Sequence, residues 1–386
     1  MQPSPPRNTH SSGHVPALDG VRGLAVLIIF LVHYGGGAQS SRPLVRLAGS
    51  ALQLGWSGVT LFFVLSGFLI TGILWGSRGR PHWWRTFAIR RALRIFPLYY
   101  LTLLVITLVA LWRHTLGAGL HTLFIYSIYA QNYNFDGHMP HVVPMEVWHF
   151  WSLAVEEQFY LVWPFLLLAM PSVRQARRLC VALFLASFLF RIAIVATGHF
   201  VALSQSTPAH AGELALGAWL ALTLIDRPQW LSRARRFART VFLAALAAAV
   251  ACGGRAHNFK LEQPPMYLGG ILALSVASGA LILLALAGGR TARLLSLAPL
   301  RRLGTISYGI YVYHIFLMFL FKRITWKLVP HGSHNTYYGV RLLVAAALTL
   351  LVAELSFRFF EQPLLRLKDR LAPSPTPPEL ASASRT

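Results

Sequence analysis

The feature that most constrains this chain is a succession of apolar runs, each close to 20 residues long. A bilayer core about 30 Å thick needs roughly 17 to 25 apolar residues per helix. We therefore predict an all-α, polytopic integral membrane protein with about ten transmembrane helices. The candidate spans are 20–37, 52–74, 95–112, 151–170, 179–196, 208–225, 238–254, 267–288, 305–321 and 338–357.

Composition excludes an ordinary water-soluble enzyme. Of the 386 residues, 55% are hydrophobic and 12% are charged, whereas a soluble domain carries about 25% charged residues. The formal net charge is +23, but the basic residues lie between the apolar runs. This charge indicates membrane topology and not nucleic-acid binding, so we expect the lipid bilayer as a partner and no nucleic acid.

The basic residues also favour one orientation. With ten spans and a cytoplasmic N-terminus, most of the 35 Lys and Arg residues fall in cytoplasmic loops, as the positive-inside rule requires. The weak run 120–131 is expected to be a re-entrant or surface-lying piece, because an eleventh span would invert every later loop. Both termini are thus predicted to be cytoplasmic.

The chain is expected to hold one folded domain between two disordered cytoplasmic ends. We predict a disordered N-terminus over 1–17, a transmembrane domain over 18–366 and a disordered tail over 367–386. Cys180 and Cys252 lie in apolar runs. They support neither a disulfide framework nor a cysteine-based metal site, and no metal site is predicted.

Ionisable residues inside spans are costly and are functional candidates by default. Arg22 and His33 are 11 positions apart, about three helical turns, which places them on one face and ~16 Å apart along the axis. Histidine can act as a base near neutral pH, and arginine can clamp a phosphate or carboxylate. The alternative is a structural anchor combined with a core histidine.

A second candidate segment is 148–160. Trp148, Ser152, Glu156 and Tyr160 recur every four residues and would share one helical face, while Glu157 is turned about 100° away. Glu156 is therefore the better candidate for supporting a base or a positive charge. His149 lies just outside the span, and by itself indicates an interfacial residue.

Two further groups carry a structural and a functional interpretation each. His314 shares a face with Ser307 and Tyr311, and either takes part in chemistry or is a hydrogen-bonded packing residue. Arg90, Arg91 and Arg94 form a basic helix at the inner surface, where anionic headgroups would attract it. HExxH, GxSxG, P-loop and GxGxxG motifs do not occur, so hydrolysis through a metal or nucleophile elbow, ATP-driven transport and dinucleotide chemistry have no support.

Six collinear stretches resemble the acyltransferase 3 family, integral-membrane enzymes that move acyl groups, commonly acetyl, from a coenzyme A thioester to sugar hydroxyls. The stretches are LDGVRGLAVLIIFLVH (18–33), FFVLSGFLITGIL (62–74), RRALRIFPLYYL (90–101), HFWSLAVEEQFYLVWP (149–164), ISYGIYVYHIFL (306–317) and FRFFEQP (357–363). They span nearly the whole chain in family order.

The resemblance implies a set of roles. His33 would be the general base, Arg22 its essential partner and Glu156 a support for the reaction. Coenzyme A would dock at Arg90, Arg91 and Arg94. Further substrate-binding or supporting positions would be Asp19, Ser66, Ser152, Tyr308 and His314.

The same resemblance implies acyl-CoA, with acetyl-CoA first, as co-substrate, no permanently bound cofactor, a carbohydrate acceptor, and a multi-pass location in the inner (plasma) membrane. The sequence departs from the family pattern at Thr60, where an acid is usual, and at His210 and Glu213, where Arg and Asp are common.

Two other functions compete with the enzyme. A polytopic transporter or flippase of lipid-linked sugars would use its intramembrane charges to bind headgroups without acyl chemistry. A structural subunit of an envelope-polysaccharide assembly would tolerate changes at Arg22 and His33. The six collinear stretches favour the enzyme.

Overall fold

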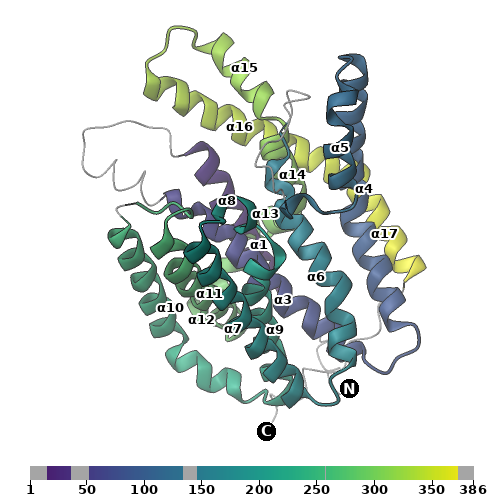
Figure 1. Ribbon diagram of the computed structural model, residues 1–386, viewed down its shortest axis with the longest axis vertical. Coiled ribbons are helices and arrows are strands. Elements are labelled where there is room, and N and C mark those ends of the chain that lie inside the picture. The colour runs from purple at the N-terminus through teal and green to yellow at the C-terminus, as the bar shows by residue number, and fades with distance from the viewer. Residues whose placement is uncertain (1–14, 36–51, 134–145, 257, 373–386) are drawn as a thin grey trace, which may run out of the picture.

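The computed structural model describes residues 15–35, 52–133, 146–256 and 258–372, which form helices and turns with no strand among them (Figure 1). The longer helices are α1 (Pro16–Tyr34), α3 (Ser57–Ser77), α4 (Trp83–Trp112), α5 (Leu116–Ser127), α6 (Trp151–Leu168), α7 (Val173–Thr197), α9 (Thr207–Asp226), α10 (Trp230–Arg255), α11 (Ile271–Leu286), α14 (Ser307–Phe316), α15 (Met318–Leu328), α16 (His334–Ser356) and α17 (Gln362–Leu371). The shorter elements are η1 (Gln53–Trp56), η2 (Gln131–Tyr133), η3 (Trp148–Phe150), α8 (Phe200–Leu203), η4 (Met266–Gly270), α12 (Gly289–Leu295), α13 (Ala298–Thr305) and η5 (Phe357–Glu361).

The all-α membrane fold is confirmed. Among the described residues, 8 helical segments are long and apolar enough to cross a membrane. They match eight of the ten predicted spans. The other two predictions fall on α6, which carries Glu156 and Glu157, and on 305–321, which is divided between α14 and α15 at Leu317. The count of ten spans and the cytoplasmic termini stay predictions.

Two expectations about the limits of elements concern the weak run 120–131 and the C-terminal end of the folded domain. The weak run 120–131 lies mostly in α5, whose 12 residues are too few to cross a bilayer. At the other end, α17 continues the helical domain to Leu371, beyond the boundary expected at residue 366. Residues 1–14 and 373–386, where disorder is expected, lie outside the described residues.

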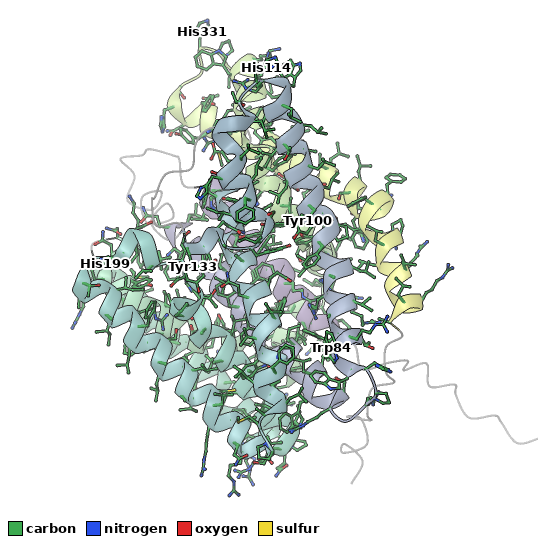
Figure 2. All side chains as sticks on the ribbon, turned by 45° about the vertical axis from the view of Figure 1, so that its right-hand side comes forward. Trp84, Tyr100, His114, Tyr133, His199 and His331 are labelled. Carbon is green, nitrogen blue, oxygen red and sulfur yellow. The ribbon has the colours of Figure 1, made fainter. Side chains whose placement is uncertain are left out.

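α4 runs along the length of the molecule, so its two ends mark the two sides of the helix bundle. Figure 2 places Trp84, at the start of α4, toward one end and His114, just after its last residue, at the other. Arg90, Arg91 and Arg94 follow Trp84 within three turns of helix. The basic stretch therefore lies in the half of α4 nearest the Trp84 end, which is the cytoplasmic side in the predicted topology.

Glycines bring the central helices into backbone contact. A Cβ atom at Gly67 of α3 would lie 1.9 Å from the carbonyl oxygen of Leu214 in α9, and one at Gly217 of α9 would lie 1.9 Å from that of Val64. On α1, a Cβ at Gly23 would lie 2.0 Å from the carbonyl oxygen of Leu300. Small residues allow this close approach between membrane helices, where packing replaces the hydrophobic effect as the driving force.

Gly67→Ala tests this packing. The added methyl group meets a backbone atom that no rotamer change can move, so α3 and α9 have to separate, and we expect a loss of about 3 kcal/mol of stability. The matched control is Gly72→Ala on the same helix, where nothing lies within 4 Å of an added Cβ. Thermal unfolding in detergent measures both variants. Equal unfolding temperatures would contradict the close contact.

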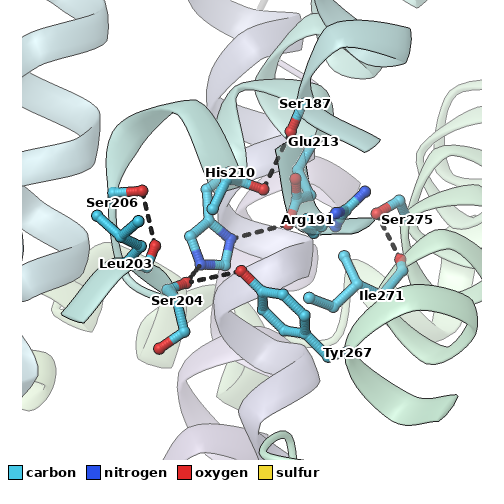
Figure 3. A network of polar contacts seen from close by, with 11 residues as sticks. Ser187, Arg191, Leu203, Ser204, Ser206, His210, Glu213, Tyr267, Ile271 and Ser275 are labelled. Carbon is cyan, nitrogen blue, oxygen red and sulfur yellow. Dashed lines mark hydrogen bonds and ion pairs between the residues drawn. The ribbon is translucent and has the colours of Figure 1, made fainter. Parts of the chain in front are cut away.

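A buried polar network joins α7 to α9 (Figure 3). Glu213 Oε1 lies 3.7 Å from Arg191 Nη1 and 2.9 Å from His210 Nδ1. His210 Nε2 lies 3.0 Å from the carbonyl oxygen of Ser204, and the Tyr267 hydroxyl donates to the same oxygen.

Removal of one charge from this network should destabilise the bundle. Arg191 and Glu213 are each 1% exposed, so Arg191→Leu leaves a buried carboxylate short of its cation, at a cost of about 3 to 5 kcal/mol. The control is Arg177→Leu, also on α7, which breaks an exposed 3.0 Å pair with Asp226 worth about 0 to 1 kcal/mol. Thermal unfolding measures the stability of both variants. Similar losses of stability in the two would contradict this prediction.

Candidate active site

Five helices line a cavity of about 100 Å³ that is partly open to the surroundings. One wall is apolar and comes mostly from α3, including Phe62, Phe63 and Leu69. The other lining residues come from α1, α4, α6 and α14. The polar lining consists of Arg22, Ser66, Arg91, Arg94, Ser152, Glu156, Tyr160, Ser307, Tyr308 and Tyr311.

The cavity carries an excess of positive charge. Its lining holds three guanidinium groups, on Arg22, Arg91 and Arg94, and one carboxylate, on Glu156. Asp19 lies one turn before Arg22, at 3.4 Å from its Nη1 atom. The guanidinium of Arg91 lies over the ring of Tyr160, 5.4 Å from its centroid. An arginine group of this kind in a partly enclosed site is suited to bind phosphate or carboxylate.

Hydroxyl groups hold the cavity wall together. Ser66 and Tyr160 hydrogen-bond to one another, and both lie within reach of the Glu156 carboxylate. The Tyr308 hydroxyl donates to the carbonyl oxygen of Ile95 at 2.7 Å, which joins α14 to α4. These contacts fix the carboxylate and the arginine-bearing helix relative to one another.

A second set of side chains, the imidazole cluster, consists of His33, His149 and His314. The ring of His314 lies 5.1 Å from that of His33 and 5.1 Å from that of His149, measured between centroids. His149 and His314 are buried, and His33 is half-buried with the exposed Trp148 ring 5.4 Å away. In the described part of the chain, no three His, Cys, Asp or Glu side chains converge as metal ligands.

Backbone carbonyls determine which nitrogen of each imidazole carries the proton. His33 Nδ1 lies 2.8 Å from the carbonyl oxygen of Ile29. His149 Nε2 and His314 Nδ1 lie 2.8 Å and 2.7 Å from the carbonyl oxygen of Tyr311. A carbonyl only accepts, so each of these nitrogens donates, and in the neutral ring the opposite nitrogen is a lone-pair acceptor. In neutral His33 the lone pair is therefore on Nε2.

Tyr311 connects the imidazole cluster to the cavity. Its hydroxyl donates to the carbonyl oxygen of His149 and lies 2.6 Å from Ser152 Oγ. Both Tyr311 and Ser152 line the cavity. Through the shared carbonyl and this hydroxyl, one residue of α14 holds η3, the start of α6 and two imidazoles in place.

The structure places the predicted site residues in distinct surroundings. Those on the cavity wall are Arg22, Ser66, Arg91, Arg94, Ser152, Glu156 and Tyr308. His33 and His314 are in the imidazole cluster, and Asp19 pairs with Arg22. Arg90 does not line this cavity, and its Nη1 donates to the carbonyl oxygen of Ala372 after α17. His210 and Glu213, the departures from the family pattern, lie in the α7–α9 network.

The interpretation of His149 as an interfacial residue was wrong, so the sequence did not predict that it belongs to the imidazole cluster. His149 is 3% exposed and is not an interfacial residue, because η3 turns it inward onto α14. Its position just before the span gave no sign of burial. Of the four residues predicted to share a helical face, Ser152, Glu156 and Tyr160 line the cavity. Trp148 does not, because it lies in η3 before α6 and is exposed.

Comparison with known proteins identifies the family of this chain and several relatives. A family model described as "Acyltransferase domain" matches residues 15–356. The chain is 29% identical over 378 residues to Peptidoglycan O-acetyltransferase OatA of Listeria monocytogenes, covering 92% of this chain and 56% of that protein. No solved structure matches.

Two other relatives give similar figures. Putative peptidoglycan O-acetyltransferase YrhL of Bacillus subtilis is 30% identical over 379 residues, with 92% of this chain and 56% of that protein covered. O-acetyltransferase OatA of Staphylococcus aureus is 26% identical over 383 residues, with 92% and 58% covered. The chain thus spans somewhat more than half the length of the relatives it matches.

Proposed function

Because the chain belongs to the acyltransferase 3 family, we propose that it moves an acyl group, acetyl in the first instance, from acyl-CoA to a hydroxyl of a cell-envelope polysaccharide or lipid-linked sugar. The observation that carries this proposal is the position of Arg22 and His33 on one continuous helix, α1. Arg22 opens onto the arginine-lined cavity, and His33 belongs to the imidazole cluster.

The arginine group suits the donor. The phosphates of coenzyme A are anionic, and guanidinium groups bind phosphate oxygens through paired hydrogen bonds. Arg91 and Arg94 lie in the half of α4 nearest Trp84. In the predicted topology this half faces the cytoplasm, where acyl-CoA is made, so the donor enters from that side.

The separation along α1 suits an elongated donor. Arg22 and His33 are 11 residues apart on α1, which corresponds to about 16 Å of helix. A ligand whose phosphates bind at the arginines has to extend over this distance to bring its thioester to His33. The pantetheine arm of coenzyme A provides such an extension.

His33 supplies the base. Its Nε2 lone pair takes the proton of the acceptor hydroxyl as the oxygen attacks the thioester carbonyl carbon. The C–S bond breaks, coenzyme A leaves as the thiolate, and the new ester remains on the sugar. General-base catalysis of this kind contributes roughly 10² to 10⁴-fold. Glu156 gives the arginines a neighbouring opposite charge and keeps their side chains ordered.

The acceptor class follows from the relatives. Two of them are named for O-acetylation of peptidoglycan, a glycan of the cell envelope. We therefore propose a hydroxyl of a cell-envelope glycan as the acceptor, and the inner (plasma) membrane as the location. Peptidoglycan fragments are the first acceptors to test.

The His33→Gln variant tests the chemistry. We expect a loss of transfer of at least 10²-fold, because glutamine keeps a polar side chain but has no basic nitrogen. Membranes that contain each protein are incubated with isotopically labelled acetyl-CoA and envelope glycans, and base-labile label on sugar is measured by mass spectrometry. Wild-type transfer in this variant would overturn the proposal. Movement of lipid-linked sugar without acyl consumption would support a transporter.

The Arg91→Gln and Arg94→Gln variants test the donor site. Each removes a cavity-lining cation, so the KM for acyl-CoA should rise about tenfold, the equivalent of one charge-assisted hydrogen bond. Arg90→Gln is the matched control on the same helix, because the Arg90 guanidinium donates to the Ala372 carbonyl and is not on the cavity wall. An equal rise in all three variants would indicate a general surface effect.

A further inference from the structure

The proposed reaction uses one member of the imidazole cluster and leaves two unexplained. We propose that His149 and His314 are positioning residues that stabilise the positive charge of His33 after it takes the acceptor proton. The chemical basis is that each ring has one nitrogen with a lone pair, and that the His314 ring lies between those of His33 and His149 in a chain of contacts. This inference rests on the proposed role of His33 as the base.

The two histidines are held with their acceptor nitrogens unpaired. The backbone carbonyl oxygen of Tyr311 accepts a hydrogen bond from one nitrogen of each ring. The opposite nitrogens, His149 Nδ1 and His314 Nε2, are buried and have no hydrogen-bond partner. A buried polar atom without a partner costs about 1 to 3 kcal/mol, so the cluster carries a cost while His33 is neutral.

Protonation of His33 changes this balance. The new N–H and its positive charge arise on a ring in contact with His314, which in turn contacts His149. Lone pairs that have no donor in the resting state are then close to a cation. Their stabilisation is thus greater after proton transfer than before it, which is the condition for an interaction to accelerate a chemical step.

Neutral imidazoles suit this role better than a carboxylate. Burial lowers the pKa of His149 well below its ordinary value, and the nearby His314 and His33 rings lower it further. A neutral ring with a lone pair can stabilise a transient cation. A carboxylate in the same place would favour the protonated form of His33, and a ring that is already protonated at rest cannot take the proton of the acceptor.

The charged and titratable groups around the cluster are engaged elsewhere. Glu146, just before η3, accepts from the Trp148 indole at 3.1 Å and lies 3.8 Å from Lys322 of α15. On α16, the Arg341 guanidinium lies over the rings of Tyr34 and Tyr338. The Tyr34 hydroxyl donates to the carbonyl oxygen of His314, and the Tyr311 hydroxyl to that of His149. His314 and His149 are therefore the rings placed to respond to His33.

The pH dependence of kcat tests this inference. His314→Phe and His149→Phe keep a ring and remove both nitrogens. Loss of stabilisation makes His33 less basic, so the acidic limb of the kcat profile moves to lower pH, by about one pH unit. The plateau falls about tenfold. His314→Gln, which retains an acceptor oxygen, should recover part of both changes. His199→Phe, on an exposed histidine before α8, is the control.

Each outcome supports or overturns the inference. A lower plateau with an unmoved acidic limb would assign the two rings to packing and overturn it, as would a limb that moves to higher pH. If one variant does not fold, the other gives the same test from the opposite side of the cluster. An active His33→Gln variant would defeat the proposed function itself, whereas an inactive one with an unmoved limb in the Phe variants defeats this inference alone.

Discussion

Glycines allow the central helices of this protein to pack backbone against backbone. At Gly67 and Gly217, α3 and α9 approach so closely that a methyl group would overlap a carbonyl oxygen, and Gly23 does the same for α1. The residues immediately before two of these glycines, Ser66 and Arg22, line the cavity. The close packing that joins the helices therefore also sets the position of the polar groups beside them.

The candidate site separates two kinds of chemistry along α1. Near Arg22 the cavity is positively charged and suited to phosphate, and near His33 the surroundings are uncharged rings held by backbone carbonyls. A phosphate needs cations to bind, whereas a base needs to remain neutral until it acts. Placing cations close to His33 would have opposed its protonation, and the length of the helix keeps the two apart.

Much of this arrangement could be predicted from periodicity. The spacing of Arg22 and His33, and the shared face of Ser152, Glu156 and Tyr160, follow from 3.6 residues per turn once the segments are helical. The apolar runs predicted an all-α membrane protein for the same reason. The inward position of His149 was not predictable, because it depends on η3, three residues at the start of α6, packing against α14.

The basic stretch of α4 also combines a feature that the sequence predicts with one that depends on packing. Its sequence indicates a positively charged helix near one membrane surface. It does not indicate which arginines line the cavity and which contact other parts of the chain. Arg91 and Arg94 line the cavity, and Arg90 donates to the carbonyl oxygen of Ala372, some 280 positions later in the chain. That contact exists because α17 packs against α4.

The class of the protein, the approximate positions of its helices and its family can all be inferred from the sequence, because hydrophobic length, helical period and collinear motifs are local properties. Three features appear only in the folded structure: five helices share one cavity, Tyr311 links this cavity to His149 and His314, and one nitrogen of each of these two rings has no hydrogen-bond partner. These depend on contacts between residues far apart in the chain, and helix-to-helix distances are set by packing that no local pattern encodes.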